Sequence, residues 1–323
     1  MATPNSSFNE LLSTTIQDLE PDMIEQILLA NAFTAGLKEY GGMGTRDGGP
    51  QIVQPIEFAE NGSYRRYTGS DILNTSQNDV FSSYNFPWAQ VALTVSITGR
   101  EMLQNSGRSG RFNLLKSRIT NAKRTFANQF NADCLSDGSA TNQVQGLQVL
   151  IAPAGTGTVG GISRASYSFA KNAFYRCTTD GGAAVTPGNI VSYMDALDLQ
   201  LRTYHAKTDF IIADDTMFRY FEGTVHPMQR LNPVDGKVGK LGFGSYAYKN
   251  SEVVFEPVAG GMPASTQYWI DCDAIELVAH ADRNLVQLDD RNSFNQDMSL
   301  AILAWMGALV GKNFRRLGTL NNN

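Results

Sequence analysis

The chain has 323 residues, of which 42% are hydrophobic and 18% are charged, and a formal net charge of −5. This composition is typical of an ordered, soluble protein of about two domains, and it gives no general reason for binding nucleic acid or an anionic membrane. Three widely separated cysteines form neither a disulfide framework nor a zinc pattern. The longest apolar run, residues 298–311, is too short to cross a bilayer, and the first residues lack the features of a signal peptide.

The first 37 residues are acidic, with five acidic residues and no Lys or Arg. Ser7 and Glu10 match a helix capping box, and Pro21 suits the first turn of a second helix. That helix would end at Gly41-Gly42, and the glycine-rich residues 41–50 are predicted to be a flexible joint. The second helix carries an apolar stripe of Ile24, Ile27 and Leu28. Because so short an arm cannot bury this stripe by itself, we expect it to dock on this subunit or on a neighbour.

Residues 51–90 are predicted to form a long two-stranded excursion. Ile52 and Phe58 belong to the outgoing strand, Asn61-Gly62 offers a turn, and residues 80–88 lead back. An isolated hairpin is marginally stable in water, so we expect this one to rest on another surface. Near its tip stand Tyr64, Arg65, Arg66 and Tyr67. Tyr and Arg are enriched at protein contacts, which favours an inter-subunit contact for one of the arginines; a solvated hairpin end is the alternative.

A strand and a long helix follow almost without a connection. Val91, Leu93, Val95 and Ile97 alternate with smaller or polar residues, as in a half-buried strand. After Gly110 the period changes to that of a helix, which is predicted to end at Ser136-Asp137-Gly138. Its apolar face comprises Phe112, Leu115, Ile119, Ala122, Phe126 and Phe130. Such a helix of about 25 residues would be about 37 Å long.

The long helix is strongly basic, because seven bases stand against two acids between residues 100 and 133. We expect the bases to lie on the face opposite the apolar stripe. They include Arg111, Lys116, Arg118, Lys123 and Arg124. A solvated or protein-contacting face, which could receive the acidic arm, is one interpretation, and contact with DNA phosphates is the other.

The remainder of the chain is predicted to be mixed α and β. A helix begins near Thr186-Pro187 and places Ile190, Met194, Leu197 and Leu201 on one face. A strand at 210–213 leads into a helix capped by Asp214. Further strands are predicted at 252–256, 268–271, 275–279, 285–288 and 299–310. The last is apolar on both faces, which indicates a central position in its sheet.

One motif imitates a cofactor site. Gly155-x-Gly157-x-x-Gly160 has the spacing of a dinucleotide-binding loop. Pro153 separates it from the preceding apolar run, and no amphipathic helix follows, so we interpret it as a glycine-rich surface loop. The three histidines (His205, His226, His280) are far apart, and no nucleophile elbow is present. We therefore predict no catalytic residue, no cofactor and no metal.

The order of these elements resembles that of the major capsid proteins of tailed bacteriophages, whose α+β shell fold is named after phage Hong Kong 97. The resemblance covers nearly the whole chain. Several short phrases also resemble one group of these coat proteins, namely Met1–Ser6, Phe58–Asn61, Arg66–Gly69, Glu101–Gly107, Gly157–Ile162 and Asp282–Asn284.

The resemblance implies a division into four parts. Residues 1–50 would form the N-terminal arm and residues 51–90 the E-loop, which lies on a neighbouring subunit in that family. Residues 91–143 and 263–323 would form the P-domain with its spine helix. Residues 144–262 would form the A-domain, at the centre of each hexamer or pentamer.

The resemblance also implies partners and a location. The chain would assemble with itself in an icosahedral head around double-stranded phage DNA, with a separate scaffolding protein and a portal, and without a membrane. It would be a virion protein assembled in the cytoplasm of the bacterial host. Some members cross-link through an E-loop lysine, but residues 51–90 contain no lysine. Arginine cannot replace it, because its guanidinium stays protonated, so we expect no cross-link.

A structural shell subunit is therefore the leading hypothesis for function. A low share of charged residues, together with 10% aromatic residues, is typical of chains that bury much surface between subunits. One alternative is an encapsulin-like compartment, which shares the fold but encloses protein cargo. The other is an α/β enzyme whose site is dispersed along the chain.

Overall fold

The computed structural model describes residues 31–72, 79–104, 108–225, 245–292 and 298–323. The helices are α2 (Ala32–Glu39), α3 (Gly99–Gln104), α4 (Arg108–Leu135), α5 (Leu147–Leu150), α6 (Ile190–Thr203) and α7 (Asp215–Val225). Short 3₁₀ turns are η1 (Ser168–Ala170), η3 (Val258–Gly260) and η4 (Phe314–Arg316). The first strands are β1 (Met43–Arg46), β2 (Ile52–Glu57), β3 (Phe81–Phe86), β4 (Ala89–Thr98), β5 (Thr158–Val159), β6 (Ile162–Ser163) and β7 (Ala173–Arg176). The later strands are β8 (Phe210–Ala213), β9 (Ser245–Tyr248), β10 (Ser251–Phe255), β11 (Thr266–Ile270), β12 (Ile275–Asn292), β13 (Met298–Gly311) and β14 (Gly318–Asn321).

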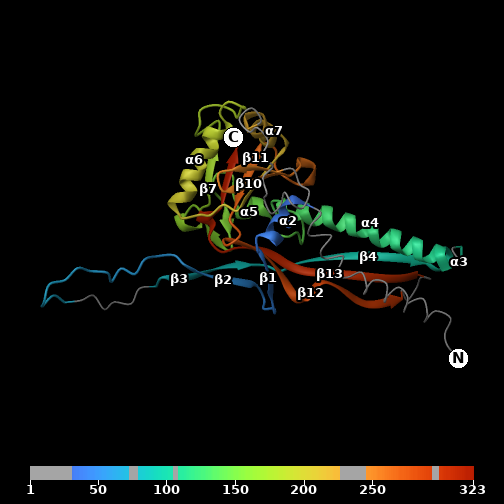
Figure 1. The fold of residues 1–323 in the computed structure, drawn as a ribbon. Helices are drawn as coiled ribbons and strands as arrows, with labels where there is room; N and C mark the ends of the chain where they lie inside the picture. The colour runs from blue at the N-terminus through green and yellow to red at the C-terminus, as the bar shows by residue number, and fades with distance from the viewer. Residues whose placement is uncertain (1–30, 73–78, 105–107, 226–244, 293–297) are drawn as a thin grey trace.

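The first layer is a four-stranded sheet covered by the long helix α4 (Figure 1). Its order is β1-β12-β13-β4, and β13 lies between two antiparallel neighbours, as its two apolar faces predict. The predicted strand before the spine helix is β4, and the helix ends at Leu135, close to the predicted stop. Phe126 and Phe130 stack at 5.4 Å between ring centroids, and Phe130 meets the edge of Trp305 of β13 at 4.7 Å.

The second layer is a six-stranded sheet in the order β7-β14-β11-β8-β10-β9. α6 packs on it through Ile190, Met194, Leu197 and Leu201, which are all buried, as their spacing predicts. Asp214 caps α7, since its Oδ1 accepts a hydrogen bond from the Met217 amide at 3.0 Å.

The strands of residues 263–323 divide between the two sheets. β12 and β13 belong to the four-stranded sheet, whereas β11 and β14 lie in the middle of the six-stranded sheet. The resemblance assigned this whole segment to the P-domain. Because β14 pairs with β7 and β11 pairs with β8, the chain's last strand completes the sheet that residues 144–262 begin.

Several sequence predictions about the elements are wrong. The glycine-rich segment 41–50 is not a joint: Met43–Arg46 forms β1, which pairs in parallel with β12. Gly44 has no Cβ, and the Glu276 carboxylate occupies the space beside it. The predicted helix from Pro21 does not run unbroken to Gly41, because the Asn31 backbone is extended and α2 begins only at Ala32; residues 21–30 lie outside the described residues. Residues 275–279 and 285–288 are not separate strands but parts of one bulged strand, β12.

Candidate functional site

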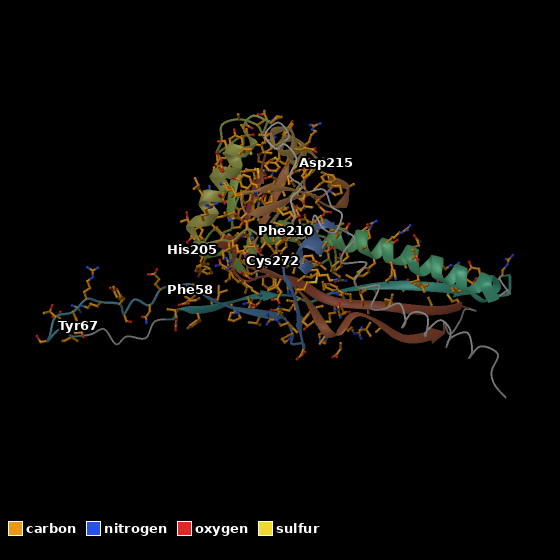
Figure 2. The ribbon with its side chains drawn as sticks, in the orientation of Figure 1. Phe58, Tyr67, His205, Phe210, Asp215 and Cys272 are labelled. Carbon is orange, nitrogen blue, oxygen red and sulfur yellow. The ribbon has the colours of Figure 1, made fainter. Side chains whose placement is uncertain are left out.

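The excursion extends away from the two sheets on the side opposite the spine helix (Figure 1). β2 and β3 pair from Ile52↔Phe86 to Glu57↔Phe81, and the Phe58 amide continues the pairing to the Val80 carbonyl at 2.9 Å. Asn61 makes a local turn, but the chain continues outward and reverses farther on, at Thr68–Asp71. Tyr67 lies at the far end of the excursion (Figure 2). The predicted hairpin turn at Asn61-Gly62 is therefore not the tip.

The outer part of the excursion exposes apolar side chains that the described subunit leaves uncovered. Tyr64 is 85% exposed, Ile72 87% and Phe81 73%. Val53, Phe58 and Tyr67 are also exposed large hydrophobic residues of this segment. So many exposed apolar side chains on one excursion favour an interaction surface, because water contact with apolar area is unfavourable.

The two tip arginines have different surroundings. Arg65 donates a hydrogen bond from Nη1 to the Ile72 carbonyl at 3.2 Å, which joins the two sides of the tip. Arg66 is exposed. The predicted pairing of one of these arginines with an adjacent subunit is a proposal, and Arg66 is the better candidate because Arg65 already holds the tip together.

The bases of α4 do not share one environment. Arg118 lies against the edge of β4, where it donates to the Ser96 carbonyl and pairs with Glu101 of α3 at 2.5 Å. This hydrogen bond is the main reason that the pKa of Glu101 is lowered. The expectation that all bases lie opposite the apolar stripe is therefore wrong for Arg118. Arg124 is exposed and Lys123 is half-buried.

Several predicted contact residues lie outside the described part of the structure. Ile24, Ile27 and Leu28 precede residue 31, and the side chains of Arg111 and Lys116 are also outside it. Docking of the arm, and any role of these two bases, are proposals.

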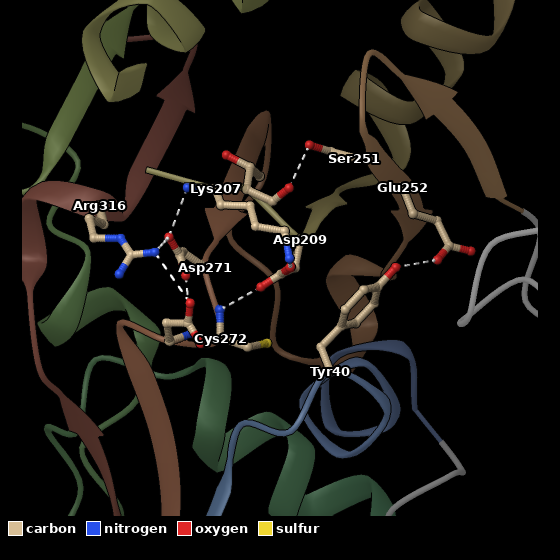
Figure 3. Close-up of polar contacts among 10 residues, drawn as sticks. Tyr40, Lys207, Asp209, Ser251, Glu252, Asp271, Cys272 and Arg316 are labelled. Carbon is tan, nitrogen blue, oxygen red and sulfur yellow. Dashed lines mark hydrogen bonds and ion pairs between the residues drawn. The ribbon is translucent and has the colours of Figure 1, made fainter. Parts of the chain in front are cut away.

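The junction between the sheets is held by buried polar groups (Figure 3). Asp271 is fully buried, pairs with Arg316 at 2.6 Å, and accepts a hydrogen bond from the Lys207 amide at 3.0 Å. Burial raises the pKa of Asp271. Tyr40, at the end of α2, donates to Glu252 of β10 at 3.1 Å. No sequence motif indicates these polar contacts, because the two residues of each contact are far apart in the chain.

Glu256 forms a second buried junction, among α2, α4 and the end of β10. Its carboxylate accepts hydrogen bonds from Asn131 Nδ2 at 2.8 Å and from the Phe33 amide at 3.2 Å. Burial raises the pKa of this carboxyl. The negative group also stands at the N-terminus of α2, where the helix dipole favours it. These contacts are structural and link the spine helix to the six-stranded sheet.

The glycine motif forms part of a small hairpin, in which β5 pairs with β6. No helix follows it directly, so the strand–turn–helix context of a dinucleotide site does not occur there. Within the described ranges, no three His, Cys, Asp or Glu residues are grouped as metal ligands would be. In the same ranges, no helix combines the length and apolar character needed to span a bilayer.

No protein family model matches the chain, and no curated protein matches it in sequence. Solved structures do match. The cyanophage A-1(L) capsid protein is 14% identical, with a TM-score of 0.65 and coverage of 91% of this chain and 93% of that one. The capsid of the native GTA particle is 11% identical, with a TM-score of 0.55 and coverage of 88% and 90%. The capsid of Myoviridae phage XM1 is 12% identical, with a TM-score of 0.51 and the same two coverages.

The matches cover 88–91% of this chain. From here on we call the excursion, residues 51–90, the E-loop, which is the name that the resemblance gives it. The sequence prediction of the fold is confirmed: the chain has the α+β, Hong Kong 97-type fold of tailed-bacteriophage capsid proteins.

Proposed function

We propose that this chain is a structural shell subunit that assembles through hexamers and pentamers into an icosahedral phage head. The observation that carries the proposal is the E-loop, which extends from the body (Figure 2) and exposes most of the side-chain surface of Tyr64, Ile72 and Phe81. A two-stranded hairpin is marginally stable alone, so an ordered E-loop needs a supporting surface. In a closed shell every subunit can supply that surface to a neighbour. The similarity to solved capsids supports this assignment.

Burial of the E-loop can supply much of the assembly free energy. Each Å² of apolar surface removed from water contributes about 25 cal/mol, and a fully buried aromatic or large aliphatic side chain contributes about 1.5–3 kcal/mol. Ordering the loop on its support opposes part of this gain. Because the contact repeats at every subunit, a modest free energy per contact is sufficient to hold a closed shell.

Further partners form the finer part of the proposal. The shell would enclose double-stranded phage DNA through non-specific contacts, and a separate scaffolding protein and a portal would take part in assembly. The acidic arm would dock on a basic surface, with the long helix as the best candidate. Exposed ion pairs contribute only about 0–1 kcal/mol each, so the apolar stripe of the arm would supply most of its binding. Assembly would take place in the cytoplasm of the bacterial host, and the product would be a virion component.

The direct test is to produce the chain with and without its scaffolding partner, and to examine it by size-exclusion chromatography and negative-stain microscopy. We expect megadalton closed shells. A chain that remains a monomer or small oligomer under both conditions would contradict the proposal and favour the enzyme alternative. Shells recovered from infected cells should protect DNA from nuclease. Protein cargo in place of DNA would instead assign the chain to an encapsulin-like compartment.

A further inference from the structure

The direction of the E-loop depends on a small buried root. Ile52, Tyr84 and Phe86 are 3%, 2% and 0% exposed, whereas Phe81 at the outer end of β3 is 73% exposed. The inner end of the hairpin is therefore packed in the subunit, whereas the Phe81 side chain at its outer end is not. Because two strands alone do not hold a fixed orientation, the contacts at the inner end decide where the loop points.

The glycine-rich hairpin β5–β6 contacts this root directly. Gly160 and Gly161, its two turn residues, have φ values of +55° and +83°, as the two central residues of a type I′ turn require. The Gly160 carbonyl accepts a hydrogen bond from the Asn85 amide of β3 at 3.0 Å. A Cβ on Gly160 would lie 2.6 Å from the Tyr84 Cβ, so only glycine allows the turn to approach β3 so closely.

Arg164 anchors the glycine-rich loop through hydrogen bonds to backbone carbonyls. Its side chain is 1% exposed, and its guanidinium donates to four backbone carbonyls at 2.6–3.2 Å. These carbonyls belong to Val149, Leu150, Thr156 and Ala170. Burial lowers the pKa of Arg164 to about 10, which leaves the guanidinium charged at neutral pH. Arginine suits this position because its planar head carries five donors, whereas lysine carries three on one atom.

Phe314 connects the arginine to the E-loop. Its ring lies 5.6 Å from the Arg164 guanidinium carbon, and it meets the Tyr84 ring edge-on at 4.9 Å. Farther out, Phe58 of the E-loop lies 5.8 Å from the ring of Phe169 of η1, whose neighbour Ala170 is held by Arg164. The same arginine thus supports the contacts on both strands of the excursion.

We propose that the β5–β6 turn and Arg164 form a socket that sets the direction in which the E-loop leaves the subunit. Gly160 receives β3, and Arg164 is a positioning residue that acts through the loop it holds. The glycine motif Gly155-x-Gly157-x-x-Gly160, which imitates a dinucleotide-binding loop, thereby serves to position the E-loop. That this direction matters for shell geometry rests on the proposed function, whereas the socket itself is a property of one subunit.

The test compares Gly160→Ala with Gly161→Ala in unassembled subunits. Both variants place alanine at a positive φ in the same turn, but a Cβ on Gly161 meets nothing within 4 Å. Hydrogen exchange of the Asn85 amide reports the contact directly. We expect about ten-fold faster exchange in Gly160→Ala than in Gly161→Ala, because only the former separates the turn from β3. Equal exchange rates in the two variants would overturn the socket.

Arg164→Lys tests the positioning role, with the Ile212 amide of the buried strand β8 as the internal reference. We expect faster exchange at Asn85 and unchanged exchange at Ile212. Acceleration at both amides, or at neither, would assign Arg164 no specific role in holding the loop.

These measurements need no assembly, so their failure is distinct from failure of the shell proposal. As a second readout, Gly160→Ala should give fewer or misshapen shells than Gly161→Ala.

Discussion

At the scale of single residues, alanine substitutions of the two tip arginines are expected to differ in their effect on assembly. Both arginines are exposed, but Arg65 donates a hydrogen bond within the tip, which leaves Arg66 as the better candidate to pair with a carboxylate of an adjacent subunit. We predict that Arg66→Ala lowers shell yield and shell melting temperature while leaving the free subunit folded. Arg65→Ala should affect shells less, by loosening the tip. Unchanged yield and melting temperature in the double variant would show that the tip contributes no assembly energy.

Glu256 should make the stability of the subunit depend on pH. Burial raises its pKa in the folded state, so the folded protein binds this proton more tightly than the unfolded chain. The resulting stabilisation is complete below the unfolded-state pKa of about 4.3 and is lost as pH rises through the higher folded-state pKa. Over this window, the unfolding free energy of Glu256→Gln should therefore decline less with rising pH than that of the wild type.

Urea unfolding of unassembled subunits between about pH 4 and about pH 8 measures this difference. Asp271, whose pKa shifts in the same direction, is present in both proteins and cancels in the comparison. Only the pH dependence of the unfolding free energy is diagnostic. The glutamine side chain of the variant has one acceptor oxygen fewer than glutamate for the Phe33 and Asn131 donors, and this difference changes the stability at every pH. Parallel curves for the two proteins would contradict the assignment.

At the scale of elements, the attachment of the spine helix depends on its C-terminal half. Phe130 is 3% exposed, between Phe126 and Trp305. Phe130→Ala should lower the unfolding free energy by about 3–5 kcal/mol, since it leaves a cavity under the helix. Gln129→Ala, on the exposed side of the same turn, should change it by less than about 0.5 kcal/mol. Denaturant unfolding of both variants tests the packing, and equal losses would contradict it.

At the scale of the whole molecule, the E-loop should be dispensable for folding and necessary for assembly. Glu57 and Phe81 are paired across the hairpin, so residues 58–80 can be replaced by Asn-Gly, which favours a tight turn. The buried root remains intact in this variant. We expect the shortened subunit to melt within a few degrees of the wild type and to form no closed shells. Normal shells from it, seen by negative stain, would exclude the E-loop as the main source of assembly energy.

Assembled shells should contain no covalent bond between subunits. Residues 51–90 lack lysine, and Cys134, Cys177 and Cys272 are all buried and form no disulfide. Burial raises the pKa of Cys134, which makes its reactive thiolate scarce. Boiling shells in detergent should release a single band near 35.3 kDa. A ladder of larger bands that persists under reducing conditions would falsify this prediction.

Much of the fold could be predicted from local sequence. β4, the end of α4, the apolar face of α6 and the Asp214 cap all depend on residues within one or two turns of the chain. Their periodicity and capping residues can therefore be recognised in the sequence itself. The E-loop could also be placed, and its Tyr and Arg residues identified as contact candidates, because an apolar hairpin with nothing beside it needs a support.

The tertiary structure decided the strand pairings and side-chain contacts that join residues distant in sequence. Residues 43–46 form a strand because they pair with the edge of β12, and β14 joins the six-stranded sheet by pairing with β7. Arg118, whose side chain is 32% exposed, turns toward β4 and α3 because Ser96 and Glu101 lie beside it. Gly160 contacts the E-loop because its carbonyl accepts a hydrogen bond from the Asn85 amide. The sequence by itself determined the local elements and the missing lysine, since these require only neighbouring residues. The pairing of strands, the direction of the E-loop and the roles of individual arginines were decided by the tertiary structure, because each requires a donor, an acceptor or an edge from a remote part of the chain.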